Sequence, residues 1–363
     1  MTNYVDGIRD FYQDKRVLIT GHTGFKGSWL SLILKRFGAE VHGLALDPLV
    51  ADGLYCNLGA DIFATDFRCD IRDLQSLKDQ FDRVEPHFVF HFAAQPLVRA
   101  SYSEPQSTWS TNVMGTVNMM EVMRSFSAGA VIGVFITSDK CYENMEWVYG
   151  YREDDRLGGR DPYSGSKGAA ELAISSYSRS FFSDPNGHKI VSVRAGNVIG
   201  GGDFSPDRIV PDIVSAWKND SAVELRSPQS TRPWQHVLDP LFGYLLTGKK
   251  LSEGSLGSGD SFNFGPSGSA ERTVHDLVDL FSKRLPGLKW SISCGGRERE
   301  AMHEFGLLRL NCDKALSRLE WRPRLGFEET VNWTADWYLE HSRDVRRSTQ
   351  VAESQILEFC DKL

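Results

Sequence analysis

Short continuous apolar runs recur through the first 195 residues, and segments with apolar residues at helical spacing separate them. Each run has the length of one buried strand; the runs span 17–19, 41–46, 63–67, 87–92, 131–136 and 190–194. The segments between them place apolar residues three or four apart, which predicts helices that pack on a sheet. This alternation predicts a Rossmann-like, doubly wound α/β fold with a parallel sheet and helices on both faces.

A glycine-rich turn follows the first run, and a helix-spaced segment follows the turn. Glycine permits a sharp bend, a close approach of a diphosphate to the backbone, and tight packing of helix on strand. The helix that follows directs free N–H groups at such an anion. The spacing Gly-x-x-Gly-x-x-Gly differs from the better-known Gly-x-Gly-x-x-Gly, and glycine turns are common, so this motif is weak alone. The predicted cofactor-binding residues of the turn are Gly21, Thr23, Gly24, Phe25, Lys26 and Gly27.

Asp47 lies 20 residues after Gly27, where the second run ends. A carboxylate there accepts hydrogen bonds from both ribose hydroxyls of NAD and repels the 2′-phosphate of NADP. A turn aspartate before Pro48 is the other interpretation. Together with the glycines, Asp47 predicts NAD as the cofactor.

Two further segments are expected to contact the cofactor. Asp70 and Ile71 follow the third run, where Asp70 is placed either to bond the adenine edge or to cap a helix. Ala93 and Ala94 follow the fourth run, and such small residues suit a cofactor lying across the sheet edge. His91, inside that run, is assigned no role. A long helix is expected over 108–126, with Asn112 forming structural hydrogen bonds behind the site.

Reactive side chains gather after the fifth run and at the start of the next helix. Ser138, Asp139 and Lys140 follow that run directly. Tyr163 and Lys167 are four residues apart in a helix expected over 162–182, so they share one face. Lys167 is expected to lower the pKa of Tyr163, which can then take a proton from an alcohol while NAD takes the hydride. A tyrosine and a lysine four residues apart also occur often by chance. The glycine turn, Asp47 and Ser138, which precede the pair in order, support the catalytic interpretation.

After residue 195 the pattern becomes irregular, which suggests a smaller lobe interleaved with returns to the main domain. Residues 1–195, with returning segments about 235–264 and 311–342, are expected to form the NAD-binding domain. Segments 196–234 and 265–310 are expected to form a substrate-binding lobe. An arginine suits a nucleotide diphosphate, although a solvated surface charge is the other interpretation for each, including Arg226. The residues assigned to the substrate are Gln95, Asn197, Arg208 and Arg232.

Composition narrows the class of protein. The 363 residues carry a net charge of −7, which argues against a general nucleic-acid partner. The six cysteines include no C-x-x-C pair, so a structural zinc site is not expected. The polar first residues contain no apolar core of a signal peptide, and no run is long enough to span a membrane. A cytoplasmic enzyme without a metal is therefore expected.

These motifs together resemble the extended short-chain dehydrogenase/reductase family over nearly the full chain, and within it the nucleotide-sugar 4,6-dehydratases. The Ser138-Asp139-Lys140 sequence is most similar to the branch that acts on CDP-glucose, since the thymidine-diphosphate branch has glutamate after the aspartate. The segments that carry the resemblance are VLITGHTGFKGSWL (17–30), TSDKCYEN (137–144), GYREDD (150–155), DPYSGSK (161–167), RAGNVIGGGD (194–203) and RPWQHV (232–237).

The resemblance implies NAD, a CDP-glucose substrate, a homodimer or homotetramer, and a role in deoxysugar synthesis of the lipopolysaccharide type. It assigns catalysis to Ser138, Asp139, Lys140, Tyr163 and Lys167, with Lys140 as the candidate base for sugar carbon 5. An epimerase or reductase of the same fold, or a dehydratase for another nucleotide sugar, would share most of these residues. A noncatalytic nucleotide-binding protein is the alternative of a different class.

Overall fold

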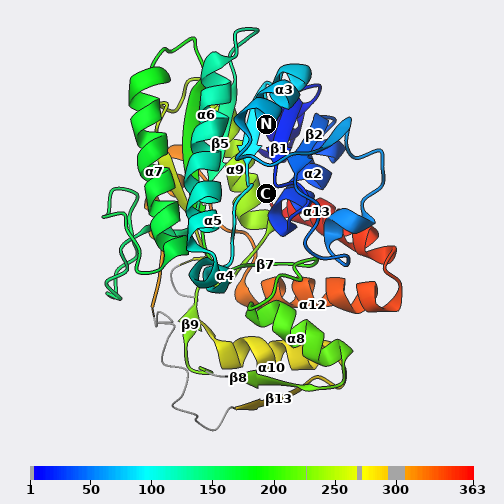
Figure 1. Ribbon diagram of the computed structural model, residues 1–363. Helices are drawn as coiled ribbons and strands as arrows, with labels where there is room; N and C mark the ends of the chain where they lie inside the picture. The colour runs from blue at the N-terminus through cyan, green and yellow to red at the C-terminus, as the bar shows by residue number, and fades with distance from the viewer. Residues whose placement is uncertain (1–3, 226, 268–271, 293–306) are drawn as a thin grey trace.

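The computed structural model describes residues 4–225, 227–267, 272–292 and 307–363. Its centre is a seven-stranded sheet in the order β11-β6-β5-β4-β1-β2-β3, in which every neighbouring pair is parallel (Figure 1). This confirms the predicted doubly wound class. The strands are β1 (Arg16–Thr20), β2 (Glu40–Ala45), β3 (Thr65–Arg68), β4 (Phe88–His91), β5 (Ile132–Ile136), β6 (Lys189–Ala195) and β11 (Ser261–Phe264).

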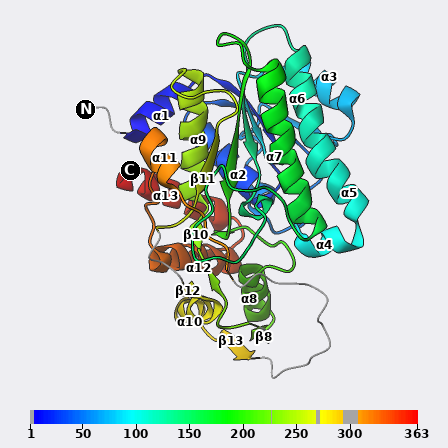
Figure 2. The same cartoon turned by 90° about the vertical axis from the view of Figure 1, so that its left-hand side faces the viewer.

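Alternate residues of each central strand point to opposite faces, so the sheet has a core on each side. In β1, Val17 and Ile19 belong to one buried cluster and Leu18 to the other. One face is covered by α3 (Leu74–Val84), α6 (Gly115–Ser125) and α7 (Pro162–Phe181). The other is covered by α1 (Tyr4–Tyr12), α2 (Phe25–Arg36), α9 (Leu238–Ser252) and α13 (Arg347–Lys362) (Figure 2).

A smaller group of elements lies below the sheet in the view of Figure 1. There, β8 (Ala222–Leu225) pairs with β13 (Lys289–Ile292), and β9 (Thr231–Arg232) pairs with β12 (Arg272–Thr273). The helices α8 (Ile209–Lys218) and α10 (Val274–Arg284) accompany them, while β7 (Val198–Ile199) pairs with β10 (Gln235–His236). The remaining helices nearer the sheet are α11 (Asp313–Leu319) and α12 (Phe327–Arg343).

Local sequence explains where the site-bearing helix begins. Asp161 precedes α7, and its carboxylate accepts a hydrogen bond from the Ser164 N–H at 2.9 Å. Pro162 occupies the first helical position, where its missing N–H costs nothing. This capped start fixes the first turn of α7, and therefore the backbone of Tyr163, beside the end of β5.

Several predicted bounds are wrong. The third strand begins at Thr65 instead of residue 63. The helix expected over 108–126 is divided into α5 (Pro105–Trp109), a π-helical turn at Ser110–Met114, and α6. Short turns and helices that the apolar pattern did not predict are η1 (Leu54–Asn57), α4 (Val98–Ser103) and η3 (Asp139–Cys141).

Candidate active site

The glycine turn joins β1 to α2 at the carboxyl edge of the sheet. Gly21 has φ +72°, and a Cβ added to it would lie 2.8 Å from the Ala93 nitrogen. A Cβ on Gly27 would lie 2.3 Å from the Gly21 carbonyl oxygen. A side chain at either position would collide with this backbone, so both glycines are needed for the tight packing of the turn against the start of α2 and the segment after β4. Thr23 connects the turn to β2 by donating a hydrogen bond to the Leu46 carbonyl at 3.2 Å.

The segment after β4 lies beside the glycine turn at the carboxyl edge of the sheet. The Ala93 N–H donates to the Thr20 hydroxyl at 3.2 Å, and Ala94 follows it. The Gln95 side chain donates both amide hydrogens within the protein, to the Leu97 carbonyl at 3.0 Å and the Thr108 hydroxyl at 2.8 Å. Its side-chain oxygen accepts the Leu97 N–H at 2.5 Å, so the proposed contact with substrate would use the second lone pair of that oxygen.

Asn112 fixes the segment after β4 from behind. Its side-chain oxygen accepts the Gln95 N–H at 2.8 Å, and its amide donates to the Gln95 carbonyl at 3.1 Å and the Ser166 hydroxyl at 2.9 Å. The predicted structural role of Asn112 is confirmed. His91 is buried and bonded to the Thr20 hydroxyl at 2.9 Å, and burial lowers its pKa to about 3.

Ser138, Tyr163 and Lys167 converge where β5 ends. The Ser138 hydroxyl lies beside the phenol of Tyr163 and lowers the pKa of that phenol. Lys167 lies one turn further along α7, and its ammonium group donates to the Ile136 carbonyl at 3.3 Å. All three residues are buried. The sheet edge and the α7 face thus bring together the hydroxyl, phenol and amine that were predicted as one group.

Burial, more than Lys167, controls the acidity of Tyr163. The pKa of Tyr163 is raised to about 12, mainly by burial and also by the charge of Asp139. The nearby Ser138 hydroxyl and the charge of Arg208 partly oppose this rise. The pKa of Tyr163 is therefore raised on balance, because the phenol is removed from water and Asp139 is close, and the expected lowering by Lys167 does not outweigh these effects. Burial also lowers the pKa of Lys167 itself to about 8.

Asp139 and Lys140 differ in their exposure to solvent. Asp139 is only 2% exposed, and one of its oxygens accepts the Ser138 hydroxyl at 3.0 Å. The carboxylate also packs on Gly196, where an added Cβ would lie 1.8 Å from Oδ2. The Lys140 ammonium lies 3.9 Å from Asp139 Oδ1, and its side chain is 33% exposed. The pair is therefore not the solvent-facing ion pair that a surface turn would place there.

Two residues near this group were not predicted as part of it. The Lys26 side chain extends from the glycine turn to within 6.0 Å of the Tyr244 ring centroid. The pKa of Lys26 is lowered to about 7, mainly by burial and also by the charges of Arg208 and Lys167. The Tyr244 hydroxyl is buried without a hydrogen-bond partner among the described residues. Tyr244 lies in the apolar run of α9, so its pattern indicates core packing, and only the fold places it near Asp139.

The buried ion pair of Glu171 and Arg194 supports the segment that carries Ser138. The Glu171 carboxylate accepts hydrogen bonds from Arg194 at 2.7 and 2.9 Å, from the Ser192 hydroxyl at 2.7 Å, and from the Thr137 hydroxyl. Arg194 also donates to the Tyr142 hydroxyl at 2.6 Å. Since Thr137 precedes Ser138 and Glu171 follows Lys167 by one turn, this pair joins both catalytic segments. The four-residue spacing from Lys167 was a signal that the sequence analysis missed.

The remaining cofactor candidates lie toward β2 and β3. Asp47 follows β2 and is ion-paired with Arg68 at 3.0 Å. Asp70 accepts the backbone N–H of Arg72 at 2.9 Å, and the cap of α3 is instead Asp73. The helix-cap interpretation of Asp70 is therefore wrong. Ile71 packs against Gly115, where an added Cβ would lie 2.3 Å from Ile71 Cδ1.

The substrate candidates fall into two groups. Arg208 donates to Asp203 at 2.8 Å, and its charge acts on both Tyr163 and Lys26, so the structure brings it to the catalytic residues. Asn197 has a left-handed backbone with φ +51° and accepts the Gln235 N–H at 3.2 Å. Arg232 lies in β9 of the smaller lobe. Arg226 lies outside the described residues.

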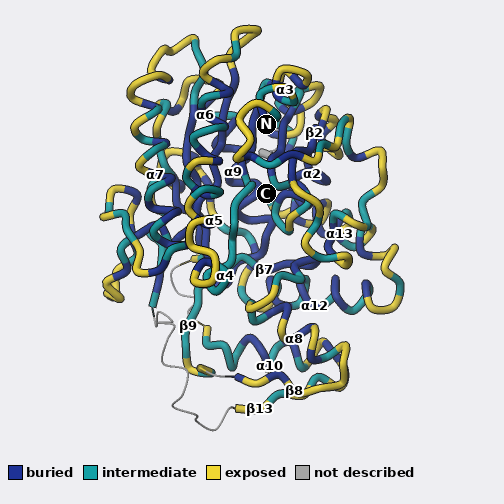
Figure 3. Tube along the Cα trace, in the orientation of Figure 1, coloured by how far each residue is buried: buried dark blue, intermediate teal, exposed yellow. Residues whose placement is uncertain are grey.

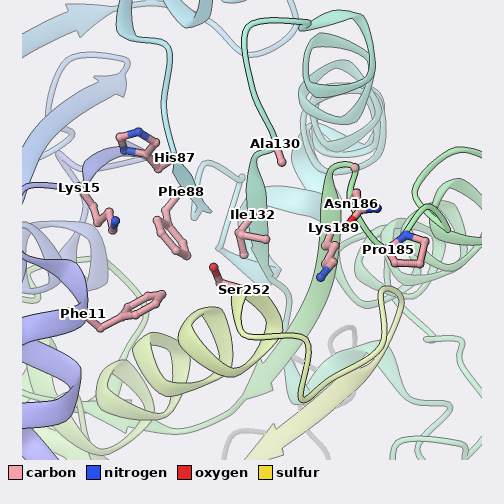
Figure 4. A pocket seen from close by; sticks show the side chains of 11 residues that line it. Phe11, Lys15, His87, Phe88, Ala130, Ile132, Pro185, Asn186, Lys189 and Ser252 are labelled. Atoms are coloured by element: carbon pink, nitrogen blue, oxygen red, sulfur yellow. The ribbon is translucent and has the colours of Figure 1, made fainter.

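A separate pocket of about 310 Å³ opens at the opposite edge of the sheet, near the amino ends of β1, β4, β5 and β6 (Figure 4). Phe11, Lys15 and Lys189 are among its lining residues, and none of the predicted site residues lines it. The described part of the chain contains no group of three histidine, cysteine or acidic residues arranged to hold a metal.

Fold and site together define an α/β protein of the short-chain dehydrogenase/reductase type. The family model described as GDP-mannose 4,6 dehydratase matches residues 18–334. CDP-glucose 4,6-dehydratase of Salmonella typhimurium is 45% identical over 334 residues, covering 91% of this chain and 92% of that protein. The chain therefore belongs to the GDP-mannose 4,6-dehydratase family, among the extended nucleotide-sugar dehydratases.

Solved structures support the same fold. An epimerase from Methanothermobacter thermautotrophicus matches with a TM-score of 0.78 and 22% identity, over 95% of this chain and 98% of its own. A dTDP-glucose 4,6-dehydratase from Bacillus anthracis, solved in complex with NAD, matches with a TM-score of 0.72 and 19% identity, over 90% of this chain and 97% of its own.

Proposed function

We propose that this chain is an NAD-dependent hydro-lyase that converts CDP-glucose to CDP-4-keto-6-deoxyglucose. The observation that carries the proposal is the placement of buried Ser138 and Tyr163 where β5 ends, with the buried Asp139 and its neighbour Lys140 beside them. A redox site needs the first two, and elimination of water needs an additional acid and base. The 45% identity to the Salmonella CDP-glucose enzyme supports the choice of substrate.

The residues present fit a dinucleotide. The tightly packed glycine turn leads directly into the first turn of α2, whose free N–H groups suit the diphosphate. When bound, NAD supplies the acceptor that takes a hydride from sugar carbon 4 and later gives it to carbon 6. The other proposed contacts are made by Thr23, Gly24, Phe25, Lys26, Asp47, Asp70, Ile71, Ala93 and Ala94, with Tyr163 and Lys167 toward the nicotinamide ribose.

Oxidation at carbon 4 depends on Tyr163. Its phenolate takes the proton of the 4-hydroxyl, and Ser138 and Tyr163 then hold the new ketone oxygen. Because burial raises the pKa of Tyr163, nearby positive charge is needed to favour the phenolate. Lys167 and Arg208 are the proposed sources of that charge. The ketone acidifies the hydrogen on carbon 5, which prepares the elimination.

Elimination uses Asp139 and Lys140. The Lys140 amine takes the proton from carbon 5, and the electron pair of that bond forms the double bond to carbon 6. The carbon–oxygen bond at carbon 6 breaks, and Asp139 in its acid form donates the proton with which the hydroxyl leaves as water. Carbon 5 is then reprotonated after carbon 6 has received the hydride. Gln95, Asn197, Arg208 and Arg232 are proposed to hold the nucleotide sugar.

The domain division, oligomeric state and cellular location that we propose follow from the resemblance to nucleotide-sugar dehydratases. We retain the division into an NAD-binding part and a smaller substrate-binding lobe, and we propose a cytoplasmic homodimer or homotetramer acting in deoxysugar synthesis of the lipopolysaccharide type. Exposed apolar side chains on neighbouring helices support self-association; they are Trp109, Met114, Leu172 and Phe181. No described helix is both long and apolar enough to cross a membrane.

A panel of CDP-, dTDP-, GDP- and UDP-sugars tests the proposal. We expect CDP-glucose to give the fastest formation of a 4-keto product that has lost its 6-hydroxyl, measured by mass spectrometry. A product isomeric with its substrate would instead identify an epimerase. Binding of NAD without turnover of any sugar in the panel would identify a noncatalytic nucleotide-binding protein.

A further inference from the structure

Five polar side chains form a cluster at the carboxyl ends of β2 and β3, away from the catalytic residues. Asp66 and Arg68 lie two residues apart in β3, so their side chains leave the same face of the sheet. Since Ala45 pairs with Arg68, the end of β3 lies beside the segment that carries Asp47. The ribose-side cluster consists of His22, Asp47, Tyr55, Asp66 and Arg68.

Arg68 is the centre of this cluster. Its Nη1 lies 2.5 Å from Asp66 Oδ1, and its Nη2 bonds the Tyr55 hydroxyl. Its Nε lies 3.0 Å from Asp47 Oδ1. The guanidinium also lies 5.4 Å from the Tyr55 ring centroid. Arg68 is therefore held by three groups, of which Asp47 is only one.

Asp66 is itself anchored independently of Asp47. The Tyr55 hydroxyl donates to Asp66 Oδ2 at 2.5 Å, and His22 Nε2 lies 2.7 Å from Asp66 Oδ1. His22 is buried within the glycine turn. The support of Arg68 therefore extends to the backbone of the proposed diphosphate site, and removal of Asp47 would leave that support intact.

Asp47 has a different environment. Its side chain is 88% exposed, whereas that of Arg68 is 36% exposed. Asp47 and Asp66 carry two negative charges against the single positive charge of Arg68. Asp47 gives the cluster its excess negative charge and is far more exposed than Asp66, whose side chain is 32% exposed.

We propose that Asp47 masks an arginine that is already positioned to bind a 2′-phosphate, and that this pair decides between NAD and NADP. With Asp47 present, its carboxylate occupies Arg68 and repels the phosphate. Without it, Arg68 stays in place through Asp66 and Tyr55 and offers its guanidinium to the phosphate. The proposal rests on the proposed dinucleotide site and assigns Arg68 a role in cofactor specificity.

Binding of NADH and NADPH tests this assignment, by fluorescence titration of protein freed from retained dinucleotide. We expect the unchanged chain to prefer NADH. Asp47→Ser should bind NADPH at least about tenfold more tightly than the unchanged chain does, because a charge-assisted hydrogen bond is gained and a repulsion is lost. Raised salt should weaken this gain, since the site is exposed.

The double variant Asp47→Ser/Arg68→Gln separates Arg68 from the simple loss of negative charge. It should lose most of the NADPH gain, and Arg68→Gln alone should bind NADPH more weakly than the unchanged chain. Arg124→Gln removes a comparable exposed pair with Glu121 on α6 and should leave both affinities unchanged.

An equal NADPH gain in the single and double variants would overturn the role of Arg68. So would an Asp47→Ser protein that binds NADPH no better than the unchanged chain while still binding NADH. Failure of the unchanged chain to bind NADH would instead refute the proposed cofactor. The two failures are thus distinguishable.

Discussion

The two ends of the proposed dinucleotide site hold their charged groups in opposite environments. At the catalytic end, Asp139 is 2% exposed, and burial dominates the pKa of both Tyr163 and Lys167. At the ribose end, Asp47 is 88% exposed, and Arg68 is held by paired hydrogen bonds. Burial therefore controls reactivity at one end, while charge and geometry near water control selectivity at the other.

Tyr163→Phe tests the catalytic end most strongly. Loss of the phenol removes the proposed base for the 4-hydroxyl, so kcat should fall by about 10³- to 10⁴-fold. NADH binding should change little, because the glycine turn and Asp47 remain. Steady-state rates and fluorescence titration measure the two quantities. Full activity in this variant would refute the proposed base.

Glu171→Ala tests the buried support of that end. Removing one partner leaves Arg194 charged and unpaired in the core, so the free energy of unfolding should fall by about 3–5 kcal/mol. The matched control, Glu121→Ala, breaks an exposed pair with Arg124 and should cost less than about 1 kcal/mol. Urea denaturation measures both. Equal losses would show that burial does not distinguish the pairs.

Lys26→Met tests whether a buried charge makes the stability of the protein depend on pH. The pKa of Lys26 is about 7 in the folded chain against 10.5 ordinarily, so the unfolded chain binds more protons between these values. The stability contribution of this lysine therefore rises with pH across that window. The substitution should stabilise the protein by about 1–2 kcal/mol at pH 7 and by less at pH 10. A benefit independent of pH would show that Lys26 is not buried as a charge.

The sequence predicted the elements whose signal is local. Buried parallel strands appear as continuous apolar runs, and the six predicted strands of the first half are all present with shifted bounds. The C-terminal helix α13 was missed, because its apolar positions are separated by many polar ones and no motif marks it. The π-helical turn before α6 also has no clear signal in the apolar spacing.

The site was predictable where residues follow strand ends and glycine turns. Such positions meet at one edge of a parallel sheet, so Ser138, Tyr163 and Lys167 could be grouped before their contacts were known. The acidity of Tyr163 could not be predicted, because it depends on burial, which only the folded chain creates. Buried residues gather along the inner elements of the fold, and exposed ones along the outer loops (Figure 3). Tyr244 was missed for the same reason, since its position within an apolar helix indicates only packing.

Transfer of a labelled hydride tests the central claim most directly. CDP-glucose carrying deuterium at carbon 4 is supplied to the enzyme, and the 4-keto product is examined by mass spectrometry and NMR. The account predicts that the deuterium appears on the new methyl group at carbon 6 of the same sugar. A methyl group without that deuterium, formed from fully labelled substrate, would contradict it.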